Sequence, residues 1–556
     1  MSYLWYKHWP EFAKKNIDYP KIPLQRLLED SAKNYPNSNY VIFHGVFKTY
    51  KEINDMADRF ATALIDFGVK KGDKVAIYLP NIPHYPVVFF GALKAGAINI
   101  TCNPLYTDKE LAFQINDSGA KTLVVLDHPN FYPTALKTLE DVHVDNVIIC
   151  KIGDFLPLIK AKLGSWLGKI PKSSVPHKKE HYLFFDLMKK YQPEAHSFDF
   201  DTENDPALIL YTGGTTGTPK GAILTHKNFV SNIYQLNEIL WPKVNPGEAV
   251  YLGALPFYHS YGLTTCLLAA VITAAAIVFI PDPRAGNPPF TDILDAIQEY
   301  KPTLFHAVPT LYGALLTHPN ISKYDLSSIK ACVSGAAPLP LKVMEDFEKK
   351  TGANLVEGWG LTECSPVCTT NPMKEGKKPG SIGIPLPDTI LKVIDIDTGK
   401  DLPQGETGEL TIKGPQVMKG YWNKPEETSN VMTSDGFFKT GDIGHMDEDG
   451  FLFITDRKKD MIIVGGHKVY PRDVEEVLFK HPAVANAAVI GIPDEHSGEL
   501  VKGFIVLKPN QTVTEQEIIE FCKKDLTNYK VPKSIEIRNE LPMTAVGKVL
   551  RRKLKE

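Results

Sequence analysis

Residues 207–222, ALILYTGGTTGTPKGA, are the most informative stretch of this 556-residue chain. The apolar start, ALILY, has the composition of a buried strand. The nine residues from Thr212 to Lys220 include three glycines and four threonines. Glycine permits positive φ, so consecutive backbone N–H groups can converge on an anion, and threonine hydroxyls and the Lys220 ammonium add donors. The loop therefore predicts a phosphate site.

This loop differs from the P-loop of nucleoside triphosphatases, in which Gly-Lys-Ser/Thr opens a helix. Here Pro219 precedes the lysine and biases Thr218 away from helical backbone. Gly221 follows the lysine, and residues 222–226, AILTH, read as a second strand. We therefore expect a strand, a phosphate-binding turn and another strand. A plain surface turn is the alternative, but so long a run of glycine and threonine exceeds what a turn needs.

Residues 211–222, YTGGTTGTPKGA, resemble the signature loop of the adenylate-forming superfamily, which includes acyl-CoA synthetases, peptide-synthetase adenylation domains and luciferase. Further motifs follow in the family's order over nearly the whole chain. The resemblance implies that ATP and Mg²⁺ activate a carboxylic acid as an acyl-adenylate, and that the acyl group then passes to coenzyme A. It also implies that Thr216 is catalytic and binds the metal. The loop residues implied to bind the nucleotide are Thr212, Gly213, Gly214, Thr215, Thr216, Gly217 and Lys220.

Residues 357–363, EGWGLTE, resemble the adenine and metal motif of the family. By this resemblance Trp359 offers a flat face to adenine, Thr362 reaches the α-phosphate, and Glu363 is a catalytic ligand of Mg²⁺. The chemistry is consistent, because Mg²⁺ prefers hard oxygen ligands and takes few of them from protein. Glycines in this motif would let the base approach the backbone. In this motif Glu357, Gly358 and Gly360 are also implied to bind the nucleotide, as are Gly335 and Ala336 from an earlier segment.

The ribose and the reacting phosphate are implied to contact residues later in the chain. Residues 438–442, FKTGD, resemble the ribose motif, in which the Asp442 carboxylate accepts hydrogen bonds from two vicinal hydroxyls. Arg457 resembles the arm that adds a cationic donor to the same ribose. Residues 542–548, PMTAVGK, resemble the catalytic lysine motif. Lys548 would hold the carboxylate and the α-phosphate together during adenylation, which needs no protein nucleophile.

Two half-reactions in one site require a rearrangement of the C-terminal region. In the family, the small domain turns after adenylation, removes the lysine and presents another face. The pivot of that turn matches Lys459, two residues past Arg457. Gly465, Gly466 and His467 would then line a tunnel for the pantetheine thiol, although the glycines are also consistent with an ordinary turn.

Residues 334–339, SGAAPL, and 255–261, LPFYHSY, resemble the acyl-pocket segments of the family. Peptide-synthetase domains usually place an Asp in the second segment to hold an amino group, and its absence here disfavours amino acids. Some long-chain enzymes place a Trp gate four residues after the His of this segment, where Leu263 stands instead. Residues 9–36 nonetheless look most like bacterial and archaeal long-chain fatty acid ligases. The implied acid-binding residues are His259, Tyr261, Leu263 and Gly335.

The order of β-rich and helical runs predicts the architecture. In the first part of the chain, short apolar runs such as 74–80, KVAIYLP, alternate with helical ones, which predicts parallel sheets covered by helices. From about residue 395, Gly-rich turns separate short strands and predict a small antiparallel β subdomain. We therefore expect an α/β fold with an N-terminal AMP-binding (adenylation) domain of layered sheets at 1–456. A small mobile α+β domain should follow at 457–556.

The composition is that of an ordinary globular protein, with 43% hydrophobic and 23% charged residues and a net charge of −3. Nucleic acid is not expected as a partner, because proteins that bind it usually carry a basic face. The seven cysteines contain no Cys-x-x-Cys pair, which is typical of a reducing compartment. Cys364 and Cys368 have no His or Cys cluster beside them that would complete a metal site. We expect a cytoplasmic protein, and the sequence leaves its oligomeric state open.

Two segments bear on membrane contact. Residues 263–280 are uncharged and long enough to suggest a transmembrane helix. They have no basic flank, however, and read as a buried helix followed by a buried strand, AAAIVFI, that ends at Pro281. The N-terminus has no basic start before an apolar run, so no signal peptide is expected. Residues 155–172 are amphipathic and either lie on the inner face of a membrane or pack on the protein itself.

The leading interpretation is an ATP-dependent CoA ligase for long- or medium-chain fatty acids. Only eight residues follow Lys548, so free coenzyme A is the expected acceptor. An aryl or 4-coumarate type CoA ligase is the enzymatic alternative, and a panel of acids distinguishes the two. The alternative of another class is a non-catalytic nucleotide- or acyl-binding protein, against which Lys220, Glu363 and Lys548 argue.

Overall fold

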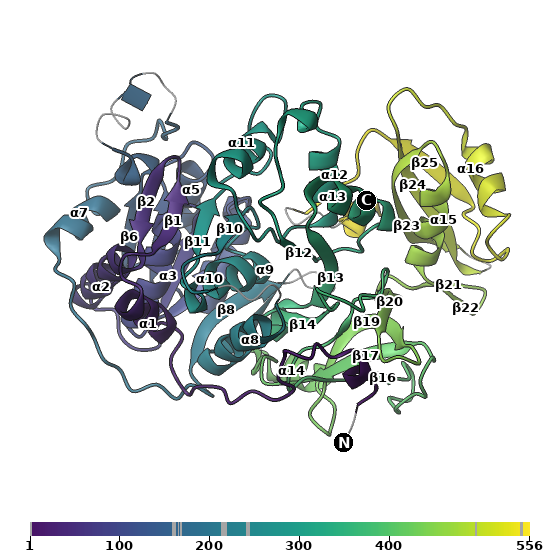
Figure 1. Cartoon of the computed structure of the whole chain (residues 1–556), viewed down its shortest axis with the longest axis horizontal. Helices are drawn as coiled ribbons and strands as arrows, with labels where there is room; N and C mark the ends of the chain where they lie inside the picture. The colour runs from purple at the N-terminus through teal and green to yellow at the C-terminus, as the bar shows by residue number, and fades with distance from the viewer. Residues whose placement is uncertain are drawn as a thin grey trace.

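The computed structural model describes residues 3–157, 163–164, 166, 170–212, 219–240, 245–494, 497–544 and 549–555. The chain forms a large α/β region, drawn purple to green in Figure 1, and a smaller α+β region, drawn yellow-green to yellow. This arrangement confirms the fold class that the sequence predicts.

The largest sheet has eight strands. Its parallel strands are connected through helices and are almost wholly buried, as expected for a sheet covered on both faces. Residues 206–225 supply an antiparallel pair, as predicted for the phosphate loop and its flanks. In spatial order the strands are β18 (Gly420–Tyr421), β9 (Lys220–Thr225), β8 (Pro206–Thr212), β4 (Ile98–Thr101), β3 (Lys74–Tyr78), β5 (Thr122–Leu126), β6 (Asn146–Cys150) and β7 (Tyr182–Leu183).

The uncharged run at 263–280 belongs to a second, four-stranded sheet and to the helix before it. The run forms η3 (Leu263–Leu268), a π-helix, then α10 (Ala269–Ile272) and β11 (Ala276–Phe279), which confirms a buried helix followed by a buried strand. Within the described ranges, no helix is both long and apolar enough to cross a membrane. In spatial order the sheet is β10 (Val250–Gly253), β11, β1 (Asn39–Phe43) and β2 (Val46–Thr49).

Two further sheets complete the large region. Leu304 bridges Tyr251 to Ala331 and so connects the second sheet to the third. The fourth sheet is antiparallel throughout, which confirms the predicted β subdomain. The third sheet is β12 (Ala331–Ser334), β13 (Asn354–Gly360), β14 (Val367–Thr370) and β15 (Ile384–Pro385), and the fourth is β16 (Ile390–Ile394), β17 (Gly408–Lys413), β19 (Phe438–Met446) and β20 (Leu452–Arg457).

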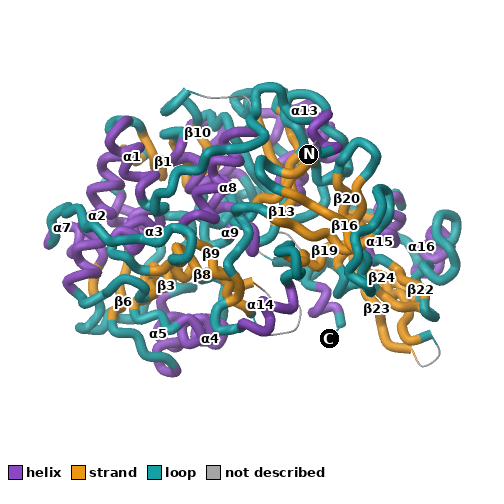
Figure 2. Tube along the Cα trace, turned by 90° about the horizontal axis from the view of Figure 1, so that it is seen from below, coloured by secondary structure: helices purple, strands orange, loops and turns teal. Residues whose placement is uncertain are grey.

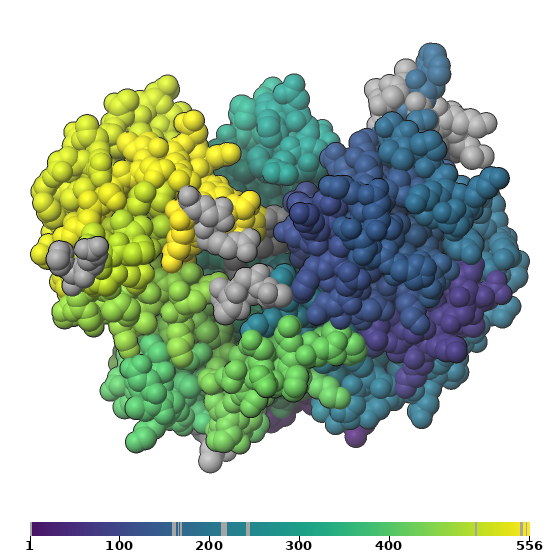
Figure 3. All heavy atoms as spheres, turned by 180° about the vertical axis from the view of Figure 1, so that it is seen from behind, coloured from purple at the N-terminus to yellow at the C-terminus, as the bar shows by residue number. Residues whose placement is uncertain are grey.

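The C-terminal region has its own sheet and its own core. Among its described residues are two α-helices, α15 (Pro471–Lys480) and α16 (Glu515–Cys522), as expected for an α+β region. Figures 1 and 2 both show the region at one end of the molecule, and Figure 3 shows it opposite the blue part of the large region. The boundary at residue 456 stays a prediction. The strands are β22 (His467–Val469), β21 (Ile462–Val464), β24 (Gly498–Leu507) and β23 (Val484–Asp494), with β25 (Ser534–Arg538) on β24.

Local sequence signals explain many helix ends. Thr49, Thr107, Thr225 and Thr514 each form a capping box at the start of a helix. The remaining helices are η1 (Leu4–His8), α1 (Arg26–Asn34), α2 (Tyr50–Asp66), α3 (His84–Lys94), α4 (Asp108–Ser118), α5 (Tyr132–Asp141), η2 (Ile152–Phe155), α7 (Phe184–Lys190), α8 (His226–Ile239), α9 (Ser260–Gly262), α11 (Thr291–Tyr300), α12 (Pro309–Leu316), η4 (Ile321–Lys323), α13 (Leu341–Thr351), η5 (Thr362–Cys364), α14 (Pro425–Val431) and η6 (Arg551–Leu554).

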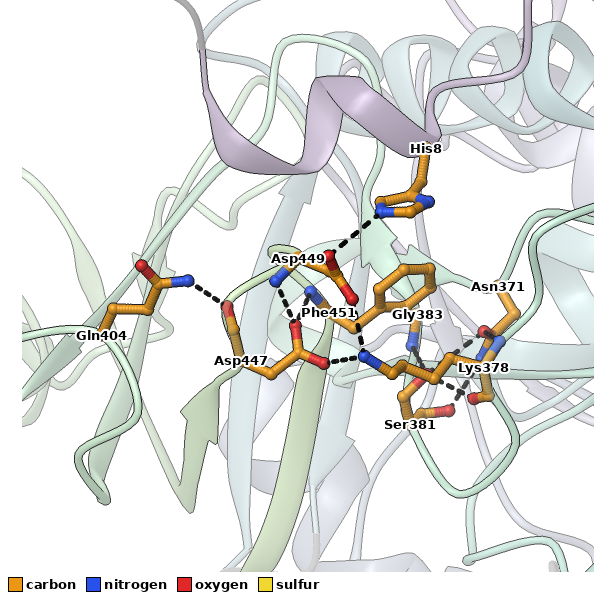
Figure 4. Close-up of polar contacts among 9 residues, drawn as sticks. All are labelled: His8, Asn371, Lys378, Ser381, Gly383, Gln404, Asp447, Asp449 and Phe451. Carbon is orange, nitrogen blue, oxygen red and sulfur yellow. Dashed lines mark hydrogen bonds and ion pairs between the residues drawn. The ribbon is translucent and has the colours of Figure 1, made fainter.

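The start of the chain is attached to the β subdomain by apolar and ionic contacts. Trp5 in η1 is buried in one cluster with Phe451. Lys378 Nζ contacts the carboxylates of Asp447 and Asp449, the latter at 3.0 Å, and His8 Nε2 lies 3.8 Å from Asp449 Oδ1 (Figure 4). These contacts hold the turn between β19 and β20 against the N-terminal segment.

All seven cysteines are free and buried. In the part of the chain that the structure describes, no group of three or more His, Cys, Asp or Glu side chains could hold a metal ion. Cys364 and Cys368 are fully buried within the main hydrophobic core, so they act as small apolar residues.

Candidate active site

The phosphate loop joins the ends of β8 and β9, which pair with Thr212 opposite Lys220. Strand packing requires Gly221, since a Cβ there would lie 2.6 Å from Ile209 Cγ2. Lys220 Nζ lies 2.5 Å from Glu427 Oε2, so a carboxylate holds this cation at the foot of the loop. Nucleotide binding by the loop stays a prediction. The loop residues Gly213, Gly214, Thr215, Thr216 and Gly217 lie outside the described residues.

A cavity of about 1570 Å³ opens beside the loop and is lined by both the large and the C-terminal regions. Sites for one small ligand usually measure about 300–1,000 Å³, so this volume is large enough for more than one substrate. Its wall combines apolar side chains, such as Leu236 and Ile239, with charged ones. The predicted site residues on its wall are Thr212, Lys220, His259, Tyr261, Gly335, Ala336, Glu357, Gly358, Trp359, Gly360, Thr362, Glu363, Asp442, Arg457 and Lys459.

Glu363 is the described residue best suited to a metal ion. Tyr421 Oη donates a hydrogen bond to Glu363 Oε1 at 2.9 Å, and burial raises the pKa of the Glu363 carboxyl. A half-buried carboxylate whose side-chain donor is a neutral phenol gains from a nearby cation. Mg²⁺ usually binds one or two carboxylates together with phosphate and water, so the residue fits Mg²⁺. Thr216, the other predicted ligand, lies outside the described residues.

Asp442, Trp359 and Arg457 form one hydrogen-bonded set. Trp359 Nε1 donates to Asp442 Oδ2 at 2.8 Å, and Arg457 Nε lies 3.0 Å from Asp442 Oδ1. The ion pair follows from strand register, because Asp442 in β19 pairs with Arg457 in β20. The structure thus brings the predicted adenine-facing ring and the two predicted ribose-binding residues into direct contact.

Three glycines of the site lie in close packing within the protein, and only at Gly360 is the space too small for any side chain. A Cβ on Gly360 would lie 2.0 Å from the Pro366 carbonyl oxygen, and one on Gly358 would lie 3.1 Å from a Val333 methyl. A Cβ on Gly335 would lie 3.0 Å from the Tyr261 ring. Close backbone packing therefore accounts for Gly360, and the approach of adenine to Gly358 and Gly360 stays a prediction.

The predicted acid-binding residues divide between the cavity and the core. His259 and Tyr261 line the cavity at the start of α9, and Tyr261 Oη donates to Val333 O at 2.8 Å. Leu263 is fully buried in η3, and the described cavity wall does not include it. His306, which the motifs did not indicate, lines the cavity, and burial lowers its pKa to about 4.

The C-terminal region presents to the cavity residues on either side of Lys548 in the sequence. Residues 543–544 and 549–551 are on the wall, and Met543 forms an antiparallel bridge with Val549. Lys548 itself lies outside the described residues. Figures 1 and 2 place β22 at the outer end of the region. The predicted tunnel residues Gly465, Gly466 and His467 are exposed there, and the described wall does not include them.

Lys459, the predicted pivot, lies just after β20 and lines the cavity. Burial lowers the pKa of its ammonium group. The Asp460 N–H donates to Arg457 O at 3.0 Å, so a turn follows the strand here. The role of Lys459 as a pivot stays a prediction.

Sequence reasoning missed Tyr421 and Glu427, which contact Glu363 and Lys220. Both come from the segment of β18 and α14, about two hundred residues after the phosphate loop. The only local signal for these two contacts is that an aromatic and an acidic residue precede the FKTGD motif in the sequence. Their role depends on pairing between β18 and β9, which no local pattern indicates.

The combination of this fold, phosphate loop and cavity defines an AMP-binding enzyme. The chain belongs to that family: residues 28–422 match the AMP-binding enzyme family, and residues 473–548 match the AMP-binding enzyme C-terminal domain.

Several relatives with full-length similarity are long-chain-fatty-acid–CoA ligases, and a probable 4-coumarate–CoA ligase of Dictyostelium discoideum is 34% identical over 97% of this chain and 96% of its own length. That of Bacillus subtilis (strain 168) is 42% identical over 99% of this chain and 97% of its own length. That of Yersinia pestis is 40% identical over 100% of this chain and 98% of its own length. The crystal structure of ATP-bound MatB from Rhodopseudomonas palustris has a TM-score of 0.81 and 29% identity, covering 96% of this chain and 98% of that chain. The similarity extends over both regions.

Proposed function

We propose that this chain is an ATP-dependent, AMP-forming CoA ligase for long- or medium-chain fatty acids. It converts a fatty acid and ATP into an acyl-adenylate and pyrophosphate, and then transfers the acyl group to coenzyme A. Mg²⁺ is the associated ion. The observation that carries the proposal is the single cavity on which Glu363, Asp442 and both flanks of Lys548 meet.

The proposed roles follow from charge and geometry. The fatty carboxylate attacks the α-phosphate while pyrophosphate leaves, so two anions must be brought together and the crowded transition state must be stabilised by cations. Lys220 and the loop would hold the phosphates, Glu363 would hold Mg²⁺, and Lys548 would bridge the carboxylate and the α-phosphate. The Asp442 and Arg457 pair would bind the ribose, with Trp359 against adenine.

The fatty acid is the proposed substrate for two reasons. The segment at 255–261 has no Asp to hold an amino group, and the relatives at 38–42% identity over the full length are named long-chain-fatty-acid–CoA ligases, whereas a relative named as a probable 4-coumarate–CoA ligase is 34% identical. Apolar side chains from α8, including Leu236 and Ile239, line the cavity together with His259 and Tyr261 and offer a surface for an acyl chain.

The decisive experiment supplies purified protein with Mg·ATP, coenzyme A and a panel of acids. The panel runs from short to long saturated acids and includes 4-coumarate and benzoate. We expect AMP and acyl-CoA with medium- or long-chain acids. A preference for the aromatic acids would instead indicate an aryl or 4-coumarate type CoA ligase. If no acid supports exchange of labelled pyrophosphate into ATP, the proposal fails.

Peripheral membrane contact through residues 155–172 is a second proposal. Leu163 is 51% exposed and Trp166 is 81% exposed, which is unusual for large apolar side chains. The protein is expected to float with anionic liposomes, and Trp166→Ser is expected to weaken this. Absence of wild-type protein from the liposome fraction would contradict the proposal.

A further inference from the structure

The junction between β20 and α15 concentrates buried charge at the predicted pivot. Asp456, the residue before the end of β20, has a side chain only 3% exposed. Helix α15 and the last residues of the chain come after Lys459 and pack around this carboxylate. Contacts between Asp456 and these later segments therefore cross the pivot.

Asp456 caps a helix that lies beyond the pivot. Its Oδ2 accepts a hydrogen bond from the Arg472 N–H at 2.7 Å, and its Oδ1 accepts one from the Arg457 N–H at 2.7 Å. Helix N-termini leave N–H groups without internal partners and favour negative charge. Tyr470, at the N-cap of α15, supplies no side-chain cap, so the carboxylate from β20 fills that role.

The Arg472 side chain crosses the pivot in the same direction. Arg472 Nη1 donates to Ile454 O in β20 at 2.7 Å, while Nε pairs with Glu476 on its own helix at 3.1 Å. The side chain is 19% exposed, so water competes weakly for these bonds. Arg472 therefore joins the first turn of α15 to the last strand of the large region.

The same cluster includes Arg551, close to the end of the chain. Arg551 Nη2 lies 2.7 Å from Glu475 Oε1, and Nη1 lies 3.1 Å from Asp460 Oδ2 and 4.0 Å from Asp456 Oδ1. Arg551 comes three residues after Lys548, whose flanks line the cavity. The arrangement with residues 543–544 and 549–551 at the cavity is thus the one in which these contacts form.

We propose that Arg472, with Asp456 as its partner across the pivot, is a positioning residue that holds the C-terminal region in the arrangement used for adenylation. This rests on the proposed function and on Lys459 as the pivot. A turn at Lys459 would carry α15 away from β20 and break both contacts. An enzyme that visits two arrangements in each cycle keeps their free energies close, so losing one charge-assisted hydrogen bond shifts the populations.

The test compares Arg472→Met with Arg472→Lys and Glu476→Gln. Methionine keeps the apolar part of the side chain and the backbone N–H that donates to Asp456, but removes the side-chain donor to Ile454 O. Lysine keeps a charged side-chain donor. Glu476→Gln changes only the partner of Arg472 on the same helix. Arg472→Met is expected to lower the kcat of pyrophosphate exchange about tenfold, with the KM for ATP within about twofold. Thioester formation from supplied acyl-adenylate should be unchanged or faster. Arg472→Lys should lose less, and Glu476→Gln should match the wild type.

Several results would overturn the inference. An equal fall in both half-reactions, or no fall in either, would remove the positioning role. A raised KM for ATP with unchanged kcat would place Arg472 in direct contact with the nucleotide. Faster tryptic cleavage after Lys458 or Lys459 in Arg472→Met, at a wild-type melting midpoint, would support an opened junction, whereas unchanged cleavage would contradict it. A wild-type protein without either half-reaction would refute the proposed function instead.

Discussion

Lys548 is the single residue on which adenylation is predicted to depend most. Its charge would hold the carboxylate and the α-phosphate together at the moment of attack. Lys548→Ala is expected to lower the adenylation rate about 10²–10³-fold, the usual effect of removing one such electrostatic contact. Transfer to coenzyme A from supplied acyl-adenylate should continue. Both half-reactions, measured on one preparation, check this, and equal losses would contradict the assigned role.

Glu357 makes the stability of the protein depend on pH. Burial raises the pKa of its carboxyl from 4.5 to about 7, although the Leu339 N–H donates to Oε2 at 3.3 Å. Between these values the native state binds more protons than the unfolded chain, so stability falls as pH rises. The stabilising contribution is complete below the unfolded pKa and is lost as pH rises through the folded pKa, a change of about 3 kcal/mol.

In the Glu357→Gln variant the side chain at this position is neutral at every pH. The variant is therefore expected to gain stability relative to the wild type as pH rises from about 5 to about 8. Melting midpoints of both proteins at the two pH values measure this. The exposed substitution Glu406→Gln is the control and should show no such trend. A difference between the two proteins that is independent of pH would show that Glu357 is ionised throughout.

Short sequence motifs predict some of the individual site residues and not others. Asp442, Arg457 and Trp359 could be selected from the sequence because each stands in a short local pattern, and the structure brings them together. Leu263 was selected by its spacing from His259, but spacing does not specify which way a side chain faces in a π-helix. Its side chain packs into the core.

At the scale of elements, β13 and the start of β14 approach so closely that Gly360 has no room for a side chain. A Cβ there would meet the Pro366 carbonyl oxygen at 2.0 Å, so Gly360→Ala must separate the two segments. We expect a loss of about 1–3 kcal/mol in unfolding free energy and a loss of adenylation. Urea unfolding and pyrophosphate exchange measure these effects.

Gly313→Ala is the matched control, because a Cβ on this residue of α12 would meet no heavy atom within 4 Å. Alanine is favoured over glycine in a helix by about 1 kcal/mol, so this variant should be as stable as the wild type or more stable. If Gly360→Ala unfolded at the same urea concentration as Gly313→Ala, the packing argument would be wrong.

Elements with strong local periodicity were predictable from the sequence. The C-terminal helix α15 and the antiparallel strands β16, β17, β19 and β20 are examples, because periodicity and turn residues report burial along one segment. The link through Leu304 between two sheets, and the packing of Trp5 on Phe451, were not predictable. Both join segments far apart in the chain, and no local pattern encodes such pairings.

At the scale of the whole molecule, Lys459→Pro tests whether the C-terminal region must turn. Proline fixes φ near about −65° and restricts the residue before it. The variant is expected to keep one half-reaction and lose the other. Adenylation should be the one retained, since the residues on either side of Lys548 already line the cavity. Lys459→Ala keeps a flexible backbone and should perform both, and full retention of both by the proline variant would exclude the pivot.

The interior location of every native thiol has a practical consequence. Burial raises the pKa of Cys102 and Cys150, and thiolates rather than thiols react with alkylating probes. The folded wild-type chain should therefore not react with maleimide dyes, so no native cysteine needs to be replaced before labelling. Single cysteines placed on the two regions could be labelled selectively, and energy transfer between the dyes would follow the proposed motion during turnover.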